Sequence, residues 1–304
     1  MKRTIWKKSI SRQLRSLSDN LLKRTKINRT KQFQDVIRFE LIKFLRSRKI
    51  RASLILTAIV PILIYLITNY VGGTFVSQIY NSESSVVNDY QIFVNFILTL
   101  TLVNVIMFGG DSLTGDFENK TGYTLFINPI SRTSFLFAKF AAASIAITSF
   151  NILFYIIASI FSYAKHSAIP ENAILSLILT TLFSLALLST SFALSSFFKR
   201  SNMSNIAFIF LWFLVVGLLE YFLVISEIKP WWSLTYAAGV VVYIFEIPYP
   251  KDSMIDIPSI LVPGQSQTIV NFIPEVNLSV GVFLIYMIVG LLVSVLFYKR
   301  KQLT

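Results

Sequence analysis

The chain has 304 residues, of which 54% are hydrophobic and only 14% are charged, and its formal net charge is +13. A typical soluble domain carries about 25% charged residues, so this composition excludes an ordinary soluble globule. The chain has no cysteine, which excludes a disulfide framework, a thiolate metal site and a cysteine nucleophile.

The N-terminal part of the chain holds most of the positive charge. Residues 1–51 contain 17 of the 28 Lys and Arg side chains and only three acidic ones. Within this part, residues 1–32 form a basic extension whose apolar residues recur at heptad-like spacing, over too few turns to claim a coiled coil. A position beside a membrane accounts for the charge, so we expect no nucleic acid as a partner.

Residues 33–51 predict an amphipathic helix at the membrane interface. Basic residues lie mostly off its apolar stripe, as in a helix that lies along the inner leaflet and leads into the first span. The helix could be an anchor on anionic headgroups or a docking surface for a protein, and the two roles are compatible. The members of the stripe are Phe33, Val36, Ile37, Leu41, Phe44 and Leu45. The residues that we assign to the interface helix are Phe33, Arg38, Glu40 and Lys43.

Six later stretches contain no Asp, Glu, Lys or Arg and are long enough to cross a bilayer, which takes roughly 20 apolar residues. They are residues 52–70, 91–110, 140–164, 172–198, 201–219 and 276–298. A seventh apolar run, residues 230–245, is too short to span and carries Trp231 and Trp232, so we expect a re-entrant or interfacial segment there. Prolines break the loop 226–275 around this run into short pieces, which argues against a separate folded domain.

The distribution of Lys and Arg predicts the orientation. With six spans, 25 of the 28 basic residues fall on the side of the N-terminus and three on the other. By the positive-inside rule both termini are then cytoplasmic. The predicted fold class is therefore an all-α integral membrane protein with six transmembrane helices and an interfacial helix before the first span, in which residues 52–304 form the transmembrane domain.

The segment 111–139, between the second and third spans, is too polar to span and too long for a simple turn. Its charged residues and its Gly and Pro predict a short helix, a break and a return to the bilayer. Its most characteristic pieces are Phe-Glu-x-x-x-Gly, which ends at Gly122, and Asn-Pro-Ile-Ser-Arg, which ends at Arg132, followed by Lys139.

These motifs, together with the amphipathic entry and the six spans, resemble the ABC-2 class of ATP-binding-cassette transporter permeases, including forms similar to the nitrous-oxide-reductase accessory permease. The resemblance covers roughly residues 33–301. It implies two permease chains around a transport path, each resting on an ATPase subunit that moves the cytoplasmic helices. The partners expected are thus an ABC ATPase, a second permease chain that is identical or different, and membrane lipid.

The resemblance also implies that segment 111–139 couples the chain to its ATPase. Two of its carboxylates would accept hydrogen bonds from the ATPase, its basic residues would bind acidic groups or lipid phosphate, and its Gly and Pro would set the bend. The alternative is a lipid-facing amphipathic loop without a partner. The residues implied in ATPase coupling are Asp116, Glu118, Lys120, Gly122, Pro129, Arg132 and Lys139.

The chain shows no sign of an enzyme. A phosphate-binding loop requires Gly-Lys followed by Ser or Thr, and the dipeptide Gly-Lys never occurs. We therefore expect no cofactor or metal in this chain, with ATP and Mg bound on the partner subunit. A single His166 belongs to no metal-ligand or catalytic constellation. The function expected is the permease of an ABC exporter in the cell membrane; the alternative is a non-transporting subunit that relays ATPase motion to an external protein.

Overall fold

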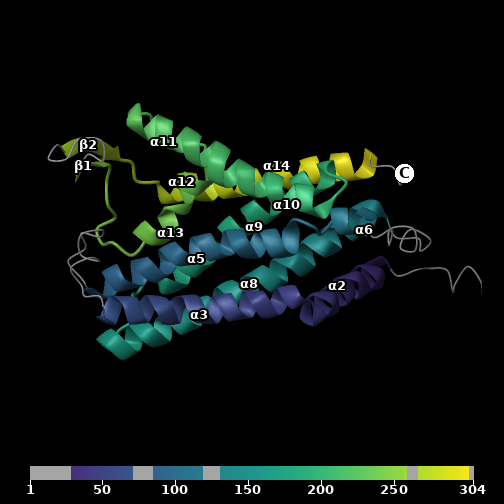
Figure 1. Cartoon of the computed structure of the whole chain (residues 1–304), viewed down its shortest axis with the longest axis horizontal. Helices are drawn as coiled ribbons and strands as arrows, with labels where there is room; N and C mark the ends of the chain where they lie inside the picture. The colour runs from purple at the N-terminus through teal and green to yellow at the C-terminus, as the bar shows by residue number, and fades with distance from the viewer. Residues whose placement is uncertain (1–28, 71–84, 119–130, 259–265, 301–304) are drawn as a thin grey trace, which may run out of the picture.

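A computed structural model describes residues 29–70, 85–118, 131–258 and 266–300 of the chain (Figure 1). The long helices are α2 (Arg29–Arg46), α3 (Arg48–Tyr70), α5 (Ser85–Gly109), α8 (Arg132–His166), α9 (Ala173–Phe197) and α14 (Val276–Arg300). The shorter elements are α6 (Thr114–Glu118), α10 (Ser201–Ile209), a π-helix (Phe210–Val216), α11 (Gly217–Ile225), α12 (Leu234–Ala238), α13 (Val240–Tyr243), β1 (Ser253–Pro258) and β2 (Ser266–Asn271).

The described residues contain six helices long and apolar enough to cross a membrane, which confirms the predicted spans and the all-α fold class. They lie side by side along the long axis of the molecule (Figure 1). The fifth span is α10, the π-helix and α11 in continuous succession. Its central π-helical turns, which include the buried Trp212, are a departure that the sequence did not predict.

The third span begins earlier than its apolar stretch. Helix α8 is 35 residues long and starts at Arg132, where the Ser131 hydroxyl oxygen caps it by accepting a hydrogen bond from the N–H of Ser134 at 3.1 Å. Arg132 and Lys139 therefore lie in the first turns of a membrane helix rather than in a connecting loop. The two turns before residue 140 are helical despite their polar residues because an N-terminal cap stabilises them.

Helix α9 is central in the bundle and packs against α14, α8, α5 and α10. Small residues make the α9–α14 contact close: a Cβ atom placed on Gly290 would lie 2.6 Å from the Ser189 hydroxyl oxygen, and that hydroxyl donates to the Tyr286 carbonyl at 2.9 Å. The Ser-rich face of α9 thus serves helix packing, as is common in membranes.

The described parts of loop 226–275 contact the bundle. Helices α12 and α13 pack on α9, and β1 and β2 form an antiparallel pair in which Ser253 faces Asn271. The two short helices cannot cross a bilayer, in keeping with the length of their apolar run. The strand pair was not predicted, because its two short strands alternate weakly and lie among prolines.

Candidate functional site

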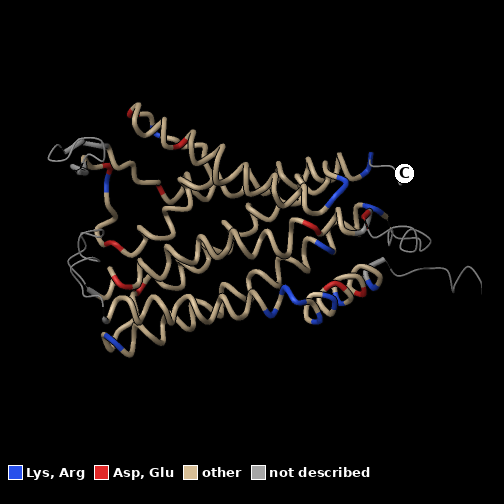
Figure 2. The backbone as a smooth tube through the Cα atoms, viewed as in Figure 1, with Lys and Arg blue, Asp and Glu red and all other residues tan. Residues whose placement is uncertain are grey.

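The described Lys and Arg residues gather at one end of the bundle, where α2, α6, the start of α8 and the end of α14 lie (Figure 2). We call this the α2 end. At the opposite end the described basic residues are Lys165 at the end of α8, Lys229 after α11 and Lys251 before β1. The coupling residues predicted from the sequence all belong to the α2 end or to the segment that leaves it.

A buried ion pair joins α2 to α8. The Nζ atom of Lys139 lies 3.2 Å from a carboxylate oxygen of Glu40, and the two residues are only 1% and 3% exposed. The same ammonium donates to the carbonyl of Ser112 at 2.7 Å and lies over the ring of Phe135. A buried charge is costly unless it is paired and hydrogen-bonded, and here both conditions are met.

A second lysine ties the start of α3 to the end of α5. The Lys49 ammonium donates to the carbonyl of Met107 at 3.0 Å and forms an ion pair with Asp111. Lys49 and Lys139 thus reach the same short turn, residues 110–113, from two different helices. We call Glu40, Lys49, Asp111, Ser112 and Lys139 the two-lysine clamp.

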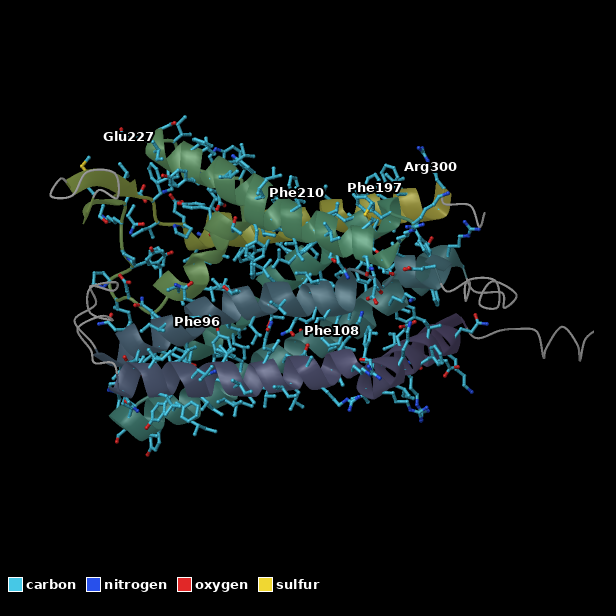
Figure 3. The ribbon with its side chains drawn as sticks, viewed as in Figure 1. Phe96, Phe108, Phe197, Phe210, Glu227 and Arg300 are labelled. Atoms are coloured by element: carbon cyan, nitrogen blue, oxygen red, sulfur yellow. The ribbon has the colours of Figure 1, made fainter. Side chains whose placement is uncertain are left out.

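Aromatic packing lies in the same region. The ring of Phe108, labelled in Figure 3, meets the ring of Phe44 edge-on at 5.2 Å and stacks on that of Phe150 at 5.7 Å. These three rings connect α2, α5 and α8. Edge-on and stacked pairs add to the stability that burial already gives, so the clamp has an apolar counterpart.

The other side of the same turn is bound to α9 and α10. The Ser195 hydroxyl accepts hydrogen bonds from the N–H of Leu113 at 3.3 Å and of Thr114 at 3.1 Å. At the end of α6, a carboxylate oxygen of Glu118 accepts from the N–H of Ser201, the first residue of α10, at 2.9 Å. The bond from Ser201 is the main reason that the pKa of the exposed Glu118 carboxylate lies below its ordinary value.

The structure describes only part of the predicted coupling set. Asp116 belongs to α6, and Lys120, Gly122 and Pro129 lie outside the described residues. Arg132 is half-buried and donates to the carbonyl of Lys299 at 3.3 Å, which joins the first turn of α8 to the last turn of α14. Lys139 is buried within the chain rather than displayed to a partner.

The interface-helix residues divide between two faces of α2. Phe33 is partly buried, whereas Arg38 and Lys43 are exposed. Glu40 lies at the centre of the buried face, four residues before Phe44. Leu45, a predicted member of the stripe, is 66% exposed because it falls at the edge of that face.

Sequence reasoning missed the partners that surround the site. The signal for Glu40 was present, because a carboxylate in the middle of an apolar stripe requires a cationic partner when the stripe packs. Lys49, Asp111, Ser195 and Ser201 carry no local signal, since their contacts join residues more than fifty positions apart.

The opposite end has its own charged contact. His166 and Lys165 both approach the Asp89 carboxylate, at 2.7 and 2.6 Å, and so fasten the end of α8 to the start of α5. Within the residues that the structure describes, no group of three or more His, Asp or Glu side chains could hold a metal ion.

A bundle of six bilayer-length helices, bound together at one basic end through the turn between two spans, defines a multi-pass membrane protein. The family model described as ABC-2 family transporter protein matches residues 36–216, from α2 to the π-helix. Because this match covers more than half of the chain, the chain belongs to the ABC-2 family of transporter proteins. No curated protein matches the sequence.

Proposed function

We propose that the chain is the permease subunit of an ABC exporter and that a separate ATPase subunit drives it from the α2 end. One observation carries the proposal: the turn after α5, together with α6, is bonded on one side to α3 and α8 and on the other to α9 and α10. The α8 lysine of this contact is in turn paired with Glu40 of α2. A displacement of this segment would reach both groups of helices. Asp116, Lys120, Gly122 and Pro129 belong to the same proposed ATPase contact.

The charge distribution supports a cytoplasmic position for the α2 end. Basic residues are favoured on the cytoplasmic side of membrane proteins, and the opposite end carries few of them. Both termini would then be cytoplasmic, in the cell membrane. The exposed Arg38 and Lys43 of α2 would meet anionic headgroups, while ATP and Mg would bind to the ATPase subunit.

Single-cysteine labelling tests the orientation, since the chain has no cysteine of its own. Arg38→Cys and Ile169→Cys place thiols at exposed positions of the two ends. In intact cells a membrane-impermeant maleimide should label position 169 and spare position 38 until the membrane is opened. Labelling of position 38 from outside would overturn the proposed orientation.

Purification of the tagged full chain from its native membrane tests the ATPase partner. We expect an ABC ATPase subunit and a second permease chain, identical or different, to remain bound after mild cross-linking. Recovery of the cross-linked chain without any nucleotide-hydrolysing subunit would contradict the proposal. The matched control is the same purification from cells in which an unrelated six-span protein carries the tag.

One observation favours transport over simple relay of motion. Asn104 is buried near the end of α5, five residues before Gly109, and neither its amide oxygen nor its amide nitrogen has a hydrogen-bond partner among the described residues. Such a group is costly in a closed apolar interior and is satisfied when water or a polar solute enters. Asn104→Cys should therefore react with a small soluble maleimide during ATP turnover. Absence of reaction in every nucleotide state would favour the relay.

The relay remains the second candidate, because the segment 226–275 forms short helices and a strand pair that could hold an external protein. Recovery of a tightly bound external protein, together with no hydration at position 104, would select it.

A further inference from the structure

The Glu40–Lys139 pair is unlike the rest of the contact between α2 and α8. Apart from the partly buried Gln32 in the first turn, the other buried or partly buried members of the α2 face are apolar: Phe33, Val36, Ile37, Leu41 and Phe44. Apolar contacts are not directional, so such a face tolerates sliding and rotation of one helix on another. A buried ion pair has one arrangement that satisfies both charges, and displacement leaves each of them unpaired.

Both charged groups are fully engaged. Lys139 holds Glu40 and the Ser112 carbonyl, while the second carboxylate oxygen of Glu40 accepts from Lys43 at 3.4 Å. Lys43 is about half exposed, whereas the Glu40 and Lys139 side chains are almost completely buried. Three segments that are distant in sequence therefore meet at one ammonium group.

We infer that Glu40 and Lys139 are positioning residues that fix the register of α2 on α8, so that α2, the turn after α5 and the first turns of α8 move as one body when the α2 end is displaced. This inference rests on the proposed function only for the source of the displacement. We call the contact that Glu40 and Lys139 make between α2 and α8 the joint. Its geometry is a property of the chain and can be measured without nucleotide.

The absence of cysteine allows paired spin labels on the full chain, reconstituted with its ATPase. Labels at Arg38→Cys on α2 and Phe137→Cys on α8 report the joint, and labels at Arg38→Cys and Leu296→Cys report movement between α2 and α14. These three positions are exposed. In the parent chain we expect a single narrow 38–137 distance that stays the same with and without trapped nucleotide, while the 38–296 distance shifts.

The test variant is the neutral double substitution Glu40→Gln/Lys139→Met, which removes both charges and keeps approximate side-chain size. We expect its 38–137 distance distribution to broaden even without nucleotide and the nucleotide-dependent 38–296 shift to be reduced or lost. Lys43→Met, which removes the exposed partner of the same carboxylate, should behave like the parent. Lys139→Arg, which keeps the charge, should preserve the narrow distance.

The possible results distinguish a failure of this inference from a failure of the proposed function. If the double variant keeps one narrow, unchanged 38–137 distance, the inference is wrong, whatever the ATPase does. If the distance broadens as expected but nucleotide never shifts the 38–296 pair in the parent chain, the joint stands and the proposed function fails. If the double variant does not fold, a broadened 38–137 distance in Glu40→Asp, which shortens one partner, supports the inference, and an unchanged one overturns it.

Discussion

At the scale of single residues, Lys139 and Gly290 show two ways in which residues are accommodated between the packed helices of the bundle. Lys139 brings a charge into the interior and neutralises it with Glu40 and a backbone carbonyl. Gly290 brings no side chain at all, which lets α14 approach the backbone of α9. Each of these contacts depends on the residue opposite. A substitution of one partner should therefore lower the free energy of unfolding by more than the few atoms it changes would suggest.

Lys139→Met should destabilise the chain by about 3 to 5 kcal/mol, because it leaves the Glu40 carboxylate buried beside one half-exposed lysine. Lys43→Met removes the half-exposed partner and leaves Glu40 paired with Lys139, so it should cost about 0 to 1 kcal/mol. Denaturant unfolding in detergent, compared as a double-mutant cycle with Glu40→Gln, measures the difference. Equal losses for the two lysines would show that the burial of Lys139 carries no energetic consequence.

Gly290→Ala should separate α9 from α14. The added Cβ would lie 2.6 Å from the Ser189 hydroxyl oxygen and 2.8 Å from its carbonyl carbon, which is backbone and cannot rotate away. Overpacking of this kind costs about 1 to 3 kcal/mol. Gly281→Ala in the same helix is the matched control, since nothing lies within 4 Å of its Cβ. The thermal unfolding midpoint should fall for position 290 alone.

At the scale of elements, the sequence predicted the features that local residues determine and missed those that depend on contacts with distant residues. The six spans were predictable because apolar length alone decides them, and one face of α2 was predictable from its period. The early start of α8 was not, because its polar first turns depend on the Ser131 cap. The partner of Lys139 within the chain, Glu40, was also not predictable. The sequence around a charged residue near a bilayer surface does not indicate which distant helix packs over it.

The contact between helix α6 and helix α10 should depend on pH, because it is made by the Glu118 carboxylate. The N–H of Ser201 favours the charged carboxylate and holds its pKa below the ordinary value of about 4.3. The contact between α6 and α10 is therefore complete above that ordinary value and is lost as pH falls through the lowered pKa. The amide resonance of Ser201 in selectively labelled protein should move over this acidic range. Glu118→Gln should abolish the movement, and an unchanged titration in that variant would exclude Glu118 as its source.

At the scale of the whole molecule, the α2 end contains bonds that cross between groups of helices. The two-lysine clamp holds α2, α3, α5 and α8 together, Glu118 links α6 to α10, and Arg132 links α8 to α14. Three members of the clamp, Glu40, Ser112 and Lys139, are buried, whereas the Glu118 and Arg132 contacts are exposed. Exposed links of this kind contribute little to stability and can still determine which helices follow a displacement.

Glu118→Ala/Arg132→Ala should therefore uncouple ATP hydrolysis from movement at the opposite end while the spans stay inserted. Glu118 is exposed and Arg132 is half-buried at a helix end, so expression and the unfolding midpoint should remain near those of the parent. Spin labels at Ile169→Cys and Phe222→Cys, which are exposed on the loop after α8 and on α11, would report the nucleotide-dependent shift, and we expect it to be lost. Lys299→Ala is the matched control, because Arg132 bonds to the backbone carbonyl of Lys299 and not to its side chain. If the double variant keeps both hydrolysis and the full shift, the movement is transmitted through other contacts of the bundle. If Lys299→Ala also loses the shift, the loss is due to the change of charge at the α2 end and not to the two bonds.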